Sequence, residues 1–139
     1  MAEATTRPLP VFPEPDTKPF WEATKSHELR YQTCDDCAGV VFFPRRHCTH
    51  CMSMKLSWRT SKGEGTVYTY TVIRQIGLPW FKDRVPYTVA WIDLDEGFRI
   101  LSSVVGVDDP TTDVRVGQRV RVRWEDQENG LSLPLFTPA

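Results

Sequence analysis

The sequence has no long run of apolar residues and almost no net charge. No stretch approaches the roughly 20 apolar residues of a membrane-spanning helix, and no charged-then-apolar leader opens the chain. We therefore expect a cytoplasmic protein with no membrane partner. The formal net charge is −1, from 17 Lys and Arg residues against 18 Asp and Glu residues. This balance argues against nucleic-acid binding, which depends on neutralising phosphates.

Catalytic motifs are also missing. Neither a GxSxG nucleophile motif nor a glycine-rich phosphate loop occurs, and the acidic residues cluster in predicted turns. The three histidines, His27, His47 and His50, all lie in the first half of the chain. The sequence therefore predicts a binding module with no catalytic residues and no activity alone.

Cysteine is scarce, and its four copies are confined to one short segment. Cys34 and Cys37 form one C-x-x-C pair, and Cys48 and Cys51 form a second pair after ten intervening residues. Two such pairs can occupy the four corners around one tetrahedral ion, so we predict a structural zinc ribbon. Four protein ligands leave no open position for substrate, so the metal is expected to stabilise the fold and do no chemistry.

Other uses of these cysteines fit less well. Spacing alone does not separate zinc from iron, because iron also accepts four thiolates in tetrahedral geometry. Disulfides are disfavoured because nothing suggests an oxidising compartment, and a redox C-x-x-C usually opens a helix in a βαβ unit, which is not predicted here. His47 or His50 could replace one cysteine, but we expect both on the surface of the second knuckle.

The first 18 residues form a proline-rich arm. They contain Pro8, Pro10, Pro13 and Pro15 without apolar periodicity, which predicts an extended segment. This arm is either a disordered tail or a segment that lies along a partner surface, since a proline-stiffened chain loses less entropy when it docks.

A short helix is predicted to follow the arm, over residues 19–27. Pro19 suits a first helical turn, and Asp16 or Thr17 could cap it. The side chains of Phe20 and Trp21 would share a face, so we expect the helix to dock through an aromatic anchor. The sequence leaves open whether this anchor meets the same chain or another subunit.

The remaining pattern is that of β-strands. In the ribbon, Gly39 is expected to turn the chain out of the first knuckle. Predicted ribbon strands cover residues 28–33, 40–43 and 56–60, and predicted barrel strands cover 66–73, 87–92, 98–105, 120–124 and 131–136. Five strands of this size suit a small OB-type Greek-key barrel. We therefore predict a mainly β protein: an arm at 1–18, a short N-terminal helix and zinc ribbon at 19–62, and a five-stranded OB-fold barrel at 63–139.

Two segments are candidate contacts for a partner or ligand. The connection at residues 76–86 is long and apolar, which makes Trp80 and Phe81 either partner contacts or a flap folded over the barrel end. Arg45 and Arg46, next to His47, could cradle a phosphate or form a solvated turn.

Two further side-chain patterns could belong to a binding face. Arg119, Arg121 and Arg123 alternate along one predicted strand, as either a solvated face or a stripe that meets anions. Tyr68 and Tyr70 would share a face near Trp91; such aromatics stack on bases in nucleic-acid OB-folds, but barrel core or a subunit interface fits better without a basic groove.

In combination, these motifs resemble the DUF35 family. The resemblance covers residues 19 to 139, and Met52 departs from it because such knuckles commonly have glycine there. Besides the two cysteine knuckles, it is carried by residues 19–22, 32–34, 43–45, 65–72, 86–90, 94–97, 116–120 and 133–136.

The resemblance implies a rubredoxin-like zinc ribbon followed by an OB-fold, and an acyl-CoA-associated accessory subunit. Family members accompany thiolase-like enzymes, including archaeal acetoacetyl-CoA thiolases and the lipid-transfer-protein-like aldolases of steroid side-chain degradation, or are fused to MaoC-like hydratases. The resemblance thus implies that this chain organises a thiolase-like enzyme acting on acyl-CoA and shares a CoA thioester with it. The first expectation for that enzyme is a retro-aldolase of steroid side-chain degradation. A zinc-ribbon and OB-fold protein that binds nucleic acid is the alternative.

Overall fold

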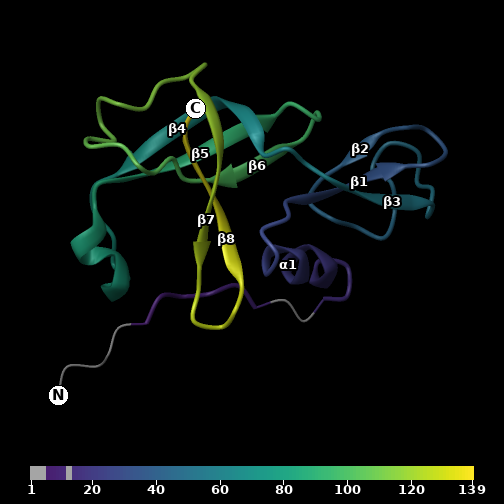
Figure 1. Ribbon diagram of the computed structural model, residues 1–139, viewed down its shortest axis with the longest axis horizontal. Helices are drawn as coiled ribbons and strands as arrows, with labels where there is room; N and C mark the ends of the chain where they lie inside the picture. The colour runs from purple at the N-terminus through teal and green to yellow at the C-terminus, as the bar shows by residue number, and fades with distance from the viewer. Residues whose placement is uncertain (1–5, 12–13) are drawn as a thin grey trace.

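The computed structural model describes residues 6–11 and 14–139, and this part of the chain is mainly β (Figure 1). The elements are α1 (Lys18–Thr24), β1 (Arg30–Cys34), β2 (Val40–Val41), β3 (Leu56–Thr60), β4 (Glu64–Ile73), the 3-10 helix η1 (Pro79–Arg84), β5 (Tyr87–Leu94), β6 (Arg99–Ser102), β7 (Arg119–Asp126) and β8 (Ser132–Pro138). The predicted fold class is confirmed. No helix in the described ranges has the length and apolar character needed to cross a bilayer.

Helix α1 is shorter than predicted and starts without the expected side-chain cap. Thr17 occupies the N-cap position, but its hydroxyl lies 3.5 Å from the carbonyl of Glu14 and does not bond to the helix. The helix ends in a turn where the N–H of His27 donates to the carbonyl of Thr24 at 2.9 Å, and His27 adopts a left-handed φ of 57°. The left-handed residue turns the chain out of the helix and towards β1.

The first sheet has the order β2-β1-β3 and is antiparallel throughout. The predicted pairing of the first two ribbon strands is confirmed, but β2 ends at Val41 instead of Phe43. Beyond the strand end, the buried side chain of Gln32 fixes the chain: it accepts from the N–H of Arg45 at 2.8 Å and donates to the Arg45 carbonyl at 3.0 Å.

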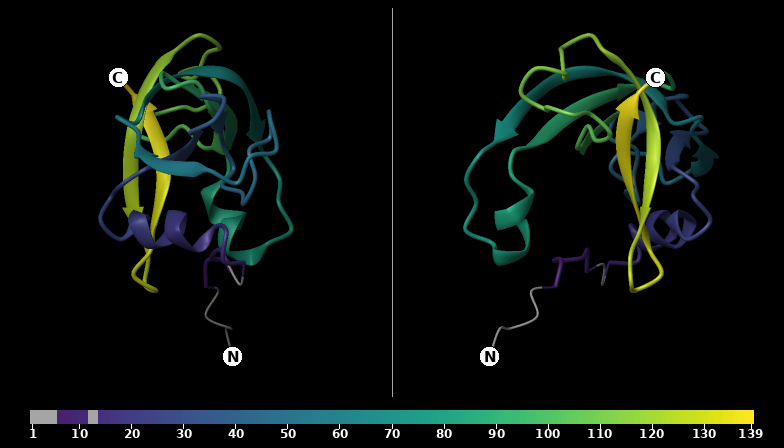
Figure 2. Two further views of the ribbon diagram at one scale, coloured as in Figure 1. Left: turned by 90° about the vertical axis from the view of Figure 1, so that its right-hand side faces the viewer. Right: turned by 60° about the vertical axis from the view of Figure 1, so that its left-hand side comes forward.

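The second sheet has the order β6-β5-β4-β7-β8 and curls so that the segment after β6 meets β8. A single parallel bridge joins Val104 to Phe136, and the N–H of Val105 donates to the Phe136 carbonyl at 2.7 Å. Strands β4 and β7 pair over only three residues, 64–66 of β4. The remainder of β4 diverges from β7, so the sheet forms a half-barrel with an arch between the η1 segment and the β7–β8 hairpin (Figure 2).

One continuous hydrophobic core joins the two sheets. Phe20 of α1 and Leu29 belong to the same buried cluster as Val67, Ile92 and Phe136 of the half-barrel. The joint is aromatic: Phe98, which follows the β5–β6 turn, lies 4.7 Å from Phe42 and 4.9 Å from Tyr31 between ring centroids. The ribbon and the half-barrel therefore share their apolar interior.

The segment between the ribbon and the half-barrel is held from both sides. The N–H of Ser61 donates to the Leu29 carbonyl at 2.8 Å, on the ribbon side. From the β5–β6 turn, the Glu96 carboxylate accepts from the Ser61 hydroxyl at 2.8 Å and from the N–H of Lys62 at 2.7 Å. Residues 61–62 thus form a fixed joint, where the sequence predicts the domain boundary.

Because Phe98 contacts both sheets, truncating it should destabilise the whole chain. We expect Phe98→Ala to lower the free energy of unfolding by about 3–5 kcal/mol, the usual cost of emptying a buried aromatic site. The matched control is Leu101→Ala on β6, because Leu101 is 53% exposed and should change stability by less than about 0.5 kcal/mol. Denaturant unfolding followed by circular dichroism measures both; equal effects would contradict the shared core.

Candidate functional site

The four cysteine sulfurs lie together between the two knuckles. All four lie within 4.8 Å of one another, and the Sγ atoms of Cys34 and Cys51, and of Cys37 and Cys48, are 3.6 Å apart. Zinc–sulfur bonds of about 2.3 Å in a tetrahedron separate the sulfurs by about 3.8 Å, whereas disulfide sulfurs lie about 2 Å apart. The cluster therefore fits one tetrahedral metal ion and excludes disulfide pairing.

The two knuckles have the same hydrogen-bond pattern. In the first, the N–H of Ala38 donates to the Cys34 carbonyl at 2.9 Å, and in the second, the N–H of Met52 donates to the Cys48 carbonyl at 3.0 Å. A backbone N–H also points at one sulfur of each knuckle, 3.4 Å from Cys37 Sγ and 3.3 Å from Cys48 Sγ. These N–H groups stabilise thiolates, which are the form that binds metal.

The thiols differ in acidity when no cation neutralises them. A backbone hydrogen bond from Cys37 lowers the pKa of Cys34 to about 7. The backbone N–H of Ser53 lowers the pKa of Cys51, but hydrogen bonding with the other sulfurs and burial together raise it to about 12. At neutral pH the cluster therefore keeps protons that a metal must displace, so zinc affinity should rise with pH.

Neither nearby histidine joins the sulfur cluster. His50 Nε2 lies 3.0 Å from the carbonyl of Val40, and His47 is exposed. The His50 ring packs so closely on Gly39 that a Cβ at position 39 would lie 2.4 Å from its Cδ2. The prediction that Gly39 turns the chain was wrong: Ala38 has the left-handed φ of 60°, and Gly39 makes room for His50.

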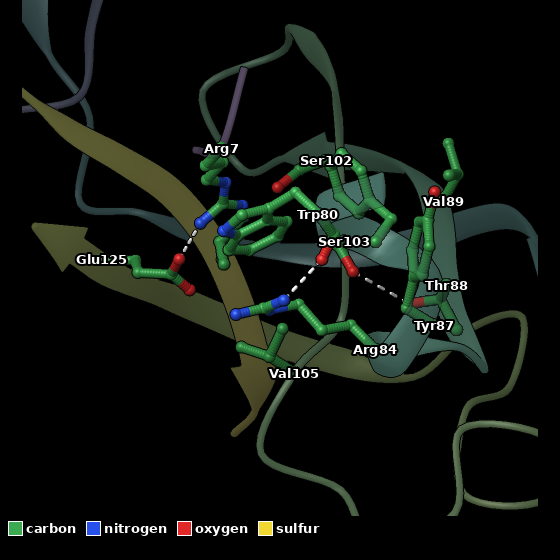
Figure 3. Close-up of a pocket in the computed structure, with 12 residues that line it drawn as sticks. Arg7, Trp80, Arg84, Tyr87, Thr88, Val89, Ser102, Ser103, Val105 and Glu125 are labelled. Atoms are coloured by element: carbon green, nitrogen blue, oxygen red, sulfur yellow. Dashed lines mark hydrogen bonds and ion pairs between the residues drawn. The ribbon is translucent and has the colours of Figure 1, made fainter. Parts of the chain in front are cut away.

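The apolar loop at 76–86 projects from the ends of β4 and β5 and forms one side of the arch (Figure 2). It contains η1, whose Trp80 and Phe81 are half-buried and stack edge to face at 4.9 Å, and Phe81 lies 5.5 Å from Tyr87 of β5. These side chains line a cavity of about 530 Å³ in the arch, together with Arg7 of the arm and Glu125 of β7 (Figure 3).

The aromatic anchor of α1 meets its own chain. Phe20 is 1% exposed and its ring lies 5.7 Å from Phe42 and 5.4 Å from Phe43, so it is unavailable to a partner in this conformation. Trp21 packs against the same core but is only half-buried. Of the two predicted helix contacts, only Trp21 offers surface.

Arg45 and Arg46 are exposed beside the second knuckle and border a surface hollow of about 430 Å³. The end of the arm contributes Glu14 and Asp16 to the same hollow, and Asp16 Oδ1 lies 4.0 Å from Arg46 Nε. The hollow thus carries both signs of charge, which weakens the case for a phosphate cradle.

The predicted aromatic face is not formed. A bulge between Val67 and Thr69 shifts the register of β4, so Tyr70 packs against the core while Tyr68 is 52% exposed. The guanidinium of Arg99 lies 3.5 Å above the Tyr68 ring, and Arg99 is paired with Asp93 at 2.5 Å. Because the Arg99 guanidinium covers this face of the Tyr68 ring, a nucleic-acid base cannot stack there.

The arginine stripe on β7 is exposed, as a solvated face would be. Arg119 is not free, because it forms two 2.7 Å hydrogen bonds with the carboxylate of Asp95. Arg121 and Arg123 form no ion pair within the described ranges.

A polar group of Ser132, Asp126 and His27 joins α1 to the β7–β8 hairpin. His27 Nε2 lies 2.6 Å from Asp126 Oδ1, the Ser132 hydroxyl donates to the same oxygen, and the His27 ring stacks on Trp124 at 5.5 Å. Both contacts lower the pKa of Asp126, that of Ser132 more. Ser132 is 1% exposed and does not touch the imidazole, so this is an anchor for the helix and not a nucleophilic triad.

The three charged residues of the arch cavity, Arg7, Arg84 and Glu125, were not predicted as site residues. Arg7 lies in the arm, where no periodicity marks one residue over another. Arg84 follows Trp80 at the spacing of one helical turn, and a helix predicted within 76–86 would have placed the two together.

Comparison with known proteins identifies both parts of the chain. Residues 21–55 match the family model "ChsH2, rubredoxin-like zinc ribbon domain", and residues 58–125 match "ChsH2, C-terminal OB-fold domain". The chain is 35% identical over 109 residues to a DUF35 domain-containing scaffold protein of Methanocaldococcus jannaschii, with 70% of this chain and 71% of that protein covered.

Two longer relatives are named as hydratase subunits. The chain is 34% identical over 121 residues to a probable enoyl-CoA hydratase alpha subunit of Thermomonospora curvata, covering 86% of this chain and 37% of that protein. It is 32% identical over 111 residues to the 3-oxo-4,17-pregnadiene-20-carboxyl-CoA hydratase alpha subunit of Mycobacterium tuberculosis, covering 80% and 34%. The chain thus spans about a third of the length of each.

A solved structure of an Ltp2-ChsH2(DUF35) aldolase contains a similar chain. The two are 32% identical with a TM-score of 0.81, over 95% of this chain and 98% of that one.

Removing the metal should unfold the ribbon. Its own buried cluster consists of Cys34, Val41 and Cys48, supported by Leu56, and a structural zinc site contributes about 10–16 kcal/mol in small peptides. We expect chelation to abolish hydrogen-exchange protection over residues 28–60, and zinc to restore it. Protection that survives verified metal removal in this segment would contradict the structural role.

Met52 should be a site of backbone strain, since it has a left-handed φ of 64° and its side chain is 71% exposed. We expect Met52→Gly to stabilise the zinc-loaded protein by about 0.5–1 kcal/mol, because glycine adopts this conformation without steric cost. Met54→Gly is the matched control: Met54 is 63% exposed and is not among the positive-φ residues. Thermal unfolding separates the two; similar shifts would rule out a strained knuckle.

Proposed function

Because the chain belongs to the DUF35 family, we propose that it is a non-catalytic subunit that binds and organises a thiolase-like enzyme acting on acyl-CoA thioesters. The observation that carries this proposal is the near-complete overlap with the DUF35 chain of the Ltp2-ChsH2(DUF35) aldolase, with a TM-score of 0.81 over 98% of that chain. An overlap of this extent supports the same role for both chains, since nearly every element that could contact the enzyme has a counterpart.

The reaction we propose for the partner is a retro-aldol cleavage in steroid side-chain degradation. Two names support it: the similar chain belongs to an aldolase, and one relative is a hydratase subunit for a pregnadiene-carboxyl-CoA. A retro-aldolase can act directly on the product of a hydratase. Hydration of an enoyl thioester places a hydroxyl on the β carbon, and a retro-aldol reaction breaks the bond between that carbon and the α carbon. The partner enzyme would perform the chemistry.

A rigid block is suited to organising an enzyme. The metal site fixes the knuckles, the Phe98 joint connects the ribbon to the half-barrel, and Glu96 fixes residues 61–62 between them. We propose that exposed parts of this block face the partner: Trp21 on α1, Arg45 and Arg46 beside the knuckle, and η1.

We further propose that a CoA thioester passes between subunits beside this chain. Two relatives support this, because one is named as a probable enoyl-CoA hydratase subunit and the other as a hydratase subunit for a carboxyl-CoA thioester. A MaoC-like hydratase is a second candidate partner, since two relatives named as hydratase subunits contain a segment similar to this chain.

The nucleic-acid alternative is not favoured. Tyr70 is turned into the core, and Arg99 covers Tyr68 while paired with Asp93. The relatives carry names of scaffold, hydratase and aldolase proteins.

Native mass spectrometry of the tagged protein purified from its own host tests the proposed role. We expect a complex of this chain, one zinc ion per copy and a thiolase-sized subunit. Isolation of the zinc-loaded chain alone, or with bound iron, would overturn the assignment.

The contribution of η1 can be measured in the same complex. Phe81→Ala should weaken association, because it removes the ring that supports Trp80. Lys82→Ala is the matched control and should leave association unchanged, because Lys82 takes no part in the Trp80–Phe81 ring contact and does not line the arch cavity. Equal retention of both variants would exclude η1 from the interface without affecting the proposed role.

A further inference from the structure

The arch cavity has more positive than negative charge. Two guanidinium groups line it, those of Arg7 and Arg84, and the carboxylate that faces them is Glu125 (Figure 3). Arg7 forms an ion pair with Glu125. In the described part of the chain no carboxylate lies within ion-pair distance of Arg84, so one cationic group in this cavity is unneutralised.

Both guanidinium groups are positioned by the same indole ring. The Arg84 Cζ lies 3.6 Å from the ring centroid of Trp80, and the Arg7 Cζ lies 4.7 Å from it. Arg84 also donates a hydrogen bond to the Trp80 carbonyl. In Figure 3 the two groups flank the indole, which fixes Arg84 while most of its five N–H donors remain available.

The proximity of the two cations is reflected in the acidity of Arg7. Burial lowers its pKa, and the positive charge of Arg84 lowers it further. An anion placed beside Arg84 would relieve this repulsion, so the electrostatics of the cavity favour a negatively charged occupant.

The serine and threonine hydroxyls of the cavity are already in hydrogen-bond contact within the protein. Thr88 Oγ1 donates to the carbonyl of Val104 at 3.1 Å and accepts from its N–H at 2.9 Å. The Ser102 hydroxyl donates to the Pro134 carbonyl at 2.6 Å, and the Ser103 hydroxyl lies 3.4 Å from Thr88 Oγ1. Apolar surface from residues such as Phe81, Tyr87 and Leu135 makes up the rest.

We propose that the arch cavity binds an organic monocarboxylate with an apolar body. The carboxylate would pair with Arg84 beside Trp80, and the body would lie along Phe81, Tyr87 and Leu135. A monoanion fits the charge count, because one cation is unneutralised, whereas a phosphate dianion would leave a negative charge uncompensated. The site belongs to this chain alone and does not require the partner enzyme.

The test uses the full-length, zinc-loaded chain and decanoate as the probe. Calorimetric titration should detect saturable binding of decanoate, weaker binding of decyl phosphate, and still weaker binding of decanol, which has the same apolar body without charge. Decanol binding as tight as decanoate binding would overturn the proposal, and so would the absence of decanoate binding below its micellar concentration.

A pair of variants on η1 locates the carboxylate. Arg84→Gln should weaken decanoate binding at least about tenfold, the usual consequence of losing a charged hydrogen-bond partner, while leaving the weak affinity for decanol unchanged. Unchanged decanol affinity also shows that the cavity remains folded. Lys82→Gln, which removes the same charge from a side chain of η1 that does not line the cavity, should have little effect. Equal losses of decanoate affinity in both variants would mean that positive charge attracts the anion non-specifically, which would overturn the assignment to Arg84.

Discussion

Metal ligation is the interaction on which the N-terminal half depends. The ribbon's own buried cluster contains two of the ligands themselves, Cys34 and Cys48, so removing the ion removes the centre of that cluster. The ribbon that carries this cluster also carries Phe42 and Tyr31, whose rings pack against Phe98 of the half-barrel. Through this joint, the metal site of the ribbon is connected by packing to the core of the half-barrel.

The open side of the half-barrel follows from a short pairing between strands. Strands β4 and β7 share only three paired positions, after which β4 diverges. A fully paired barrel would fill this space with side chains; here η1 and the arm border it instead, and Arg7 contacts Trp80 on one side and Glu125 on the other. The candidate ligand site is therefore a product of incomplete closure.

Local patterns predicted most of the fold. Strand alternation and the cysteine spacing are readable along the chain, so the ribbon, the five barrel strands and the metal ligands were assigned from residues alone. Contacts between residues far apart in the sequence could not be predicted from local patterns. The bulge that separates Tyr68 from Tyr70, the burial of Phe20 and the Gly39–His50 contact all depend on tertiary packing. The arch cavity escaped prediction for the same reason, because its charged residues come from three distant segments.

The fixed joint at residues 61–62 limits how this block can vary in evolution. Each backbone position there is bonded, to Leu29 on one side and to Glu96 on the other, so an inserted residue would break one set of bonds or displace the knuckles relative to the arch. The loop before β7, around residues 108–113, is mostly exposed and bonds largely to itself. Length changes among homologues are therefore tolerable in that loop. The spacing between the ribbon and the half-barrel is constant, so any partner surface that contacts both must match this spacing.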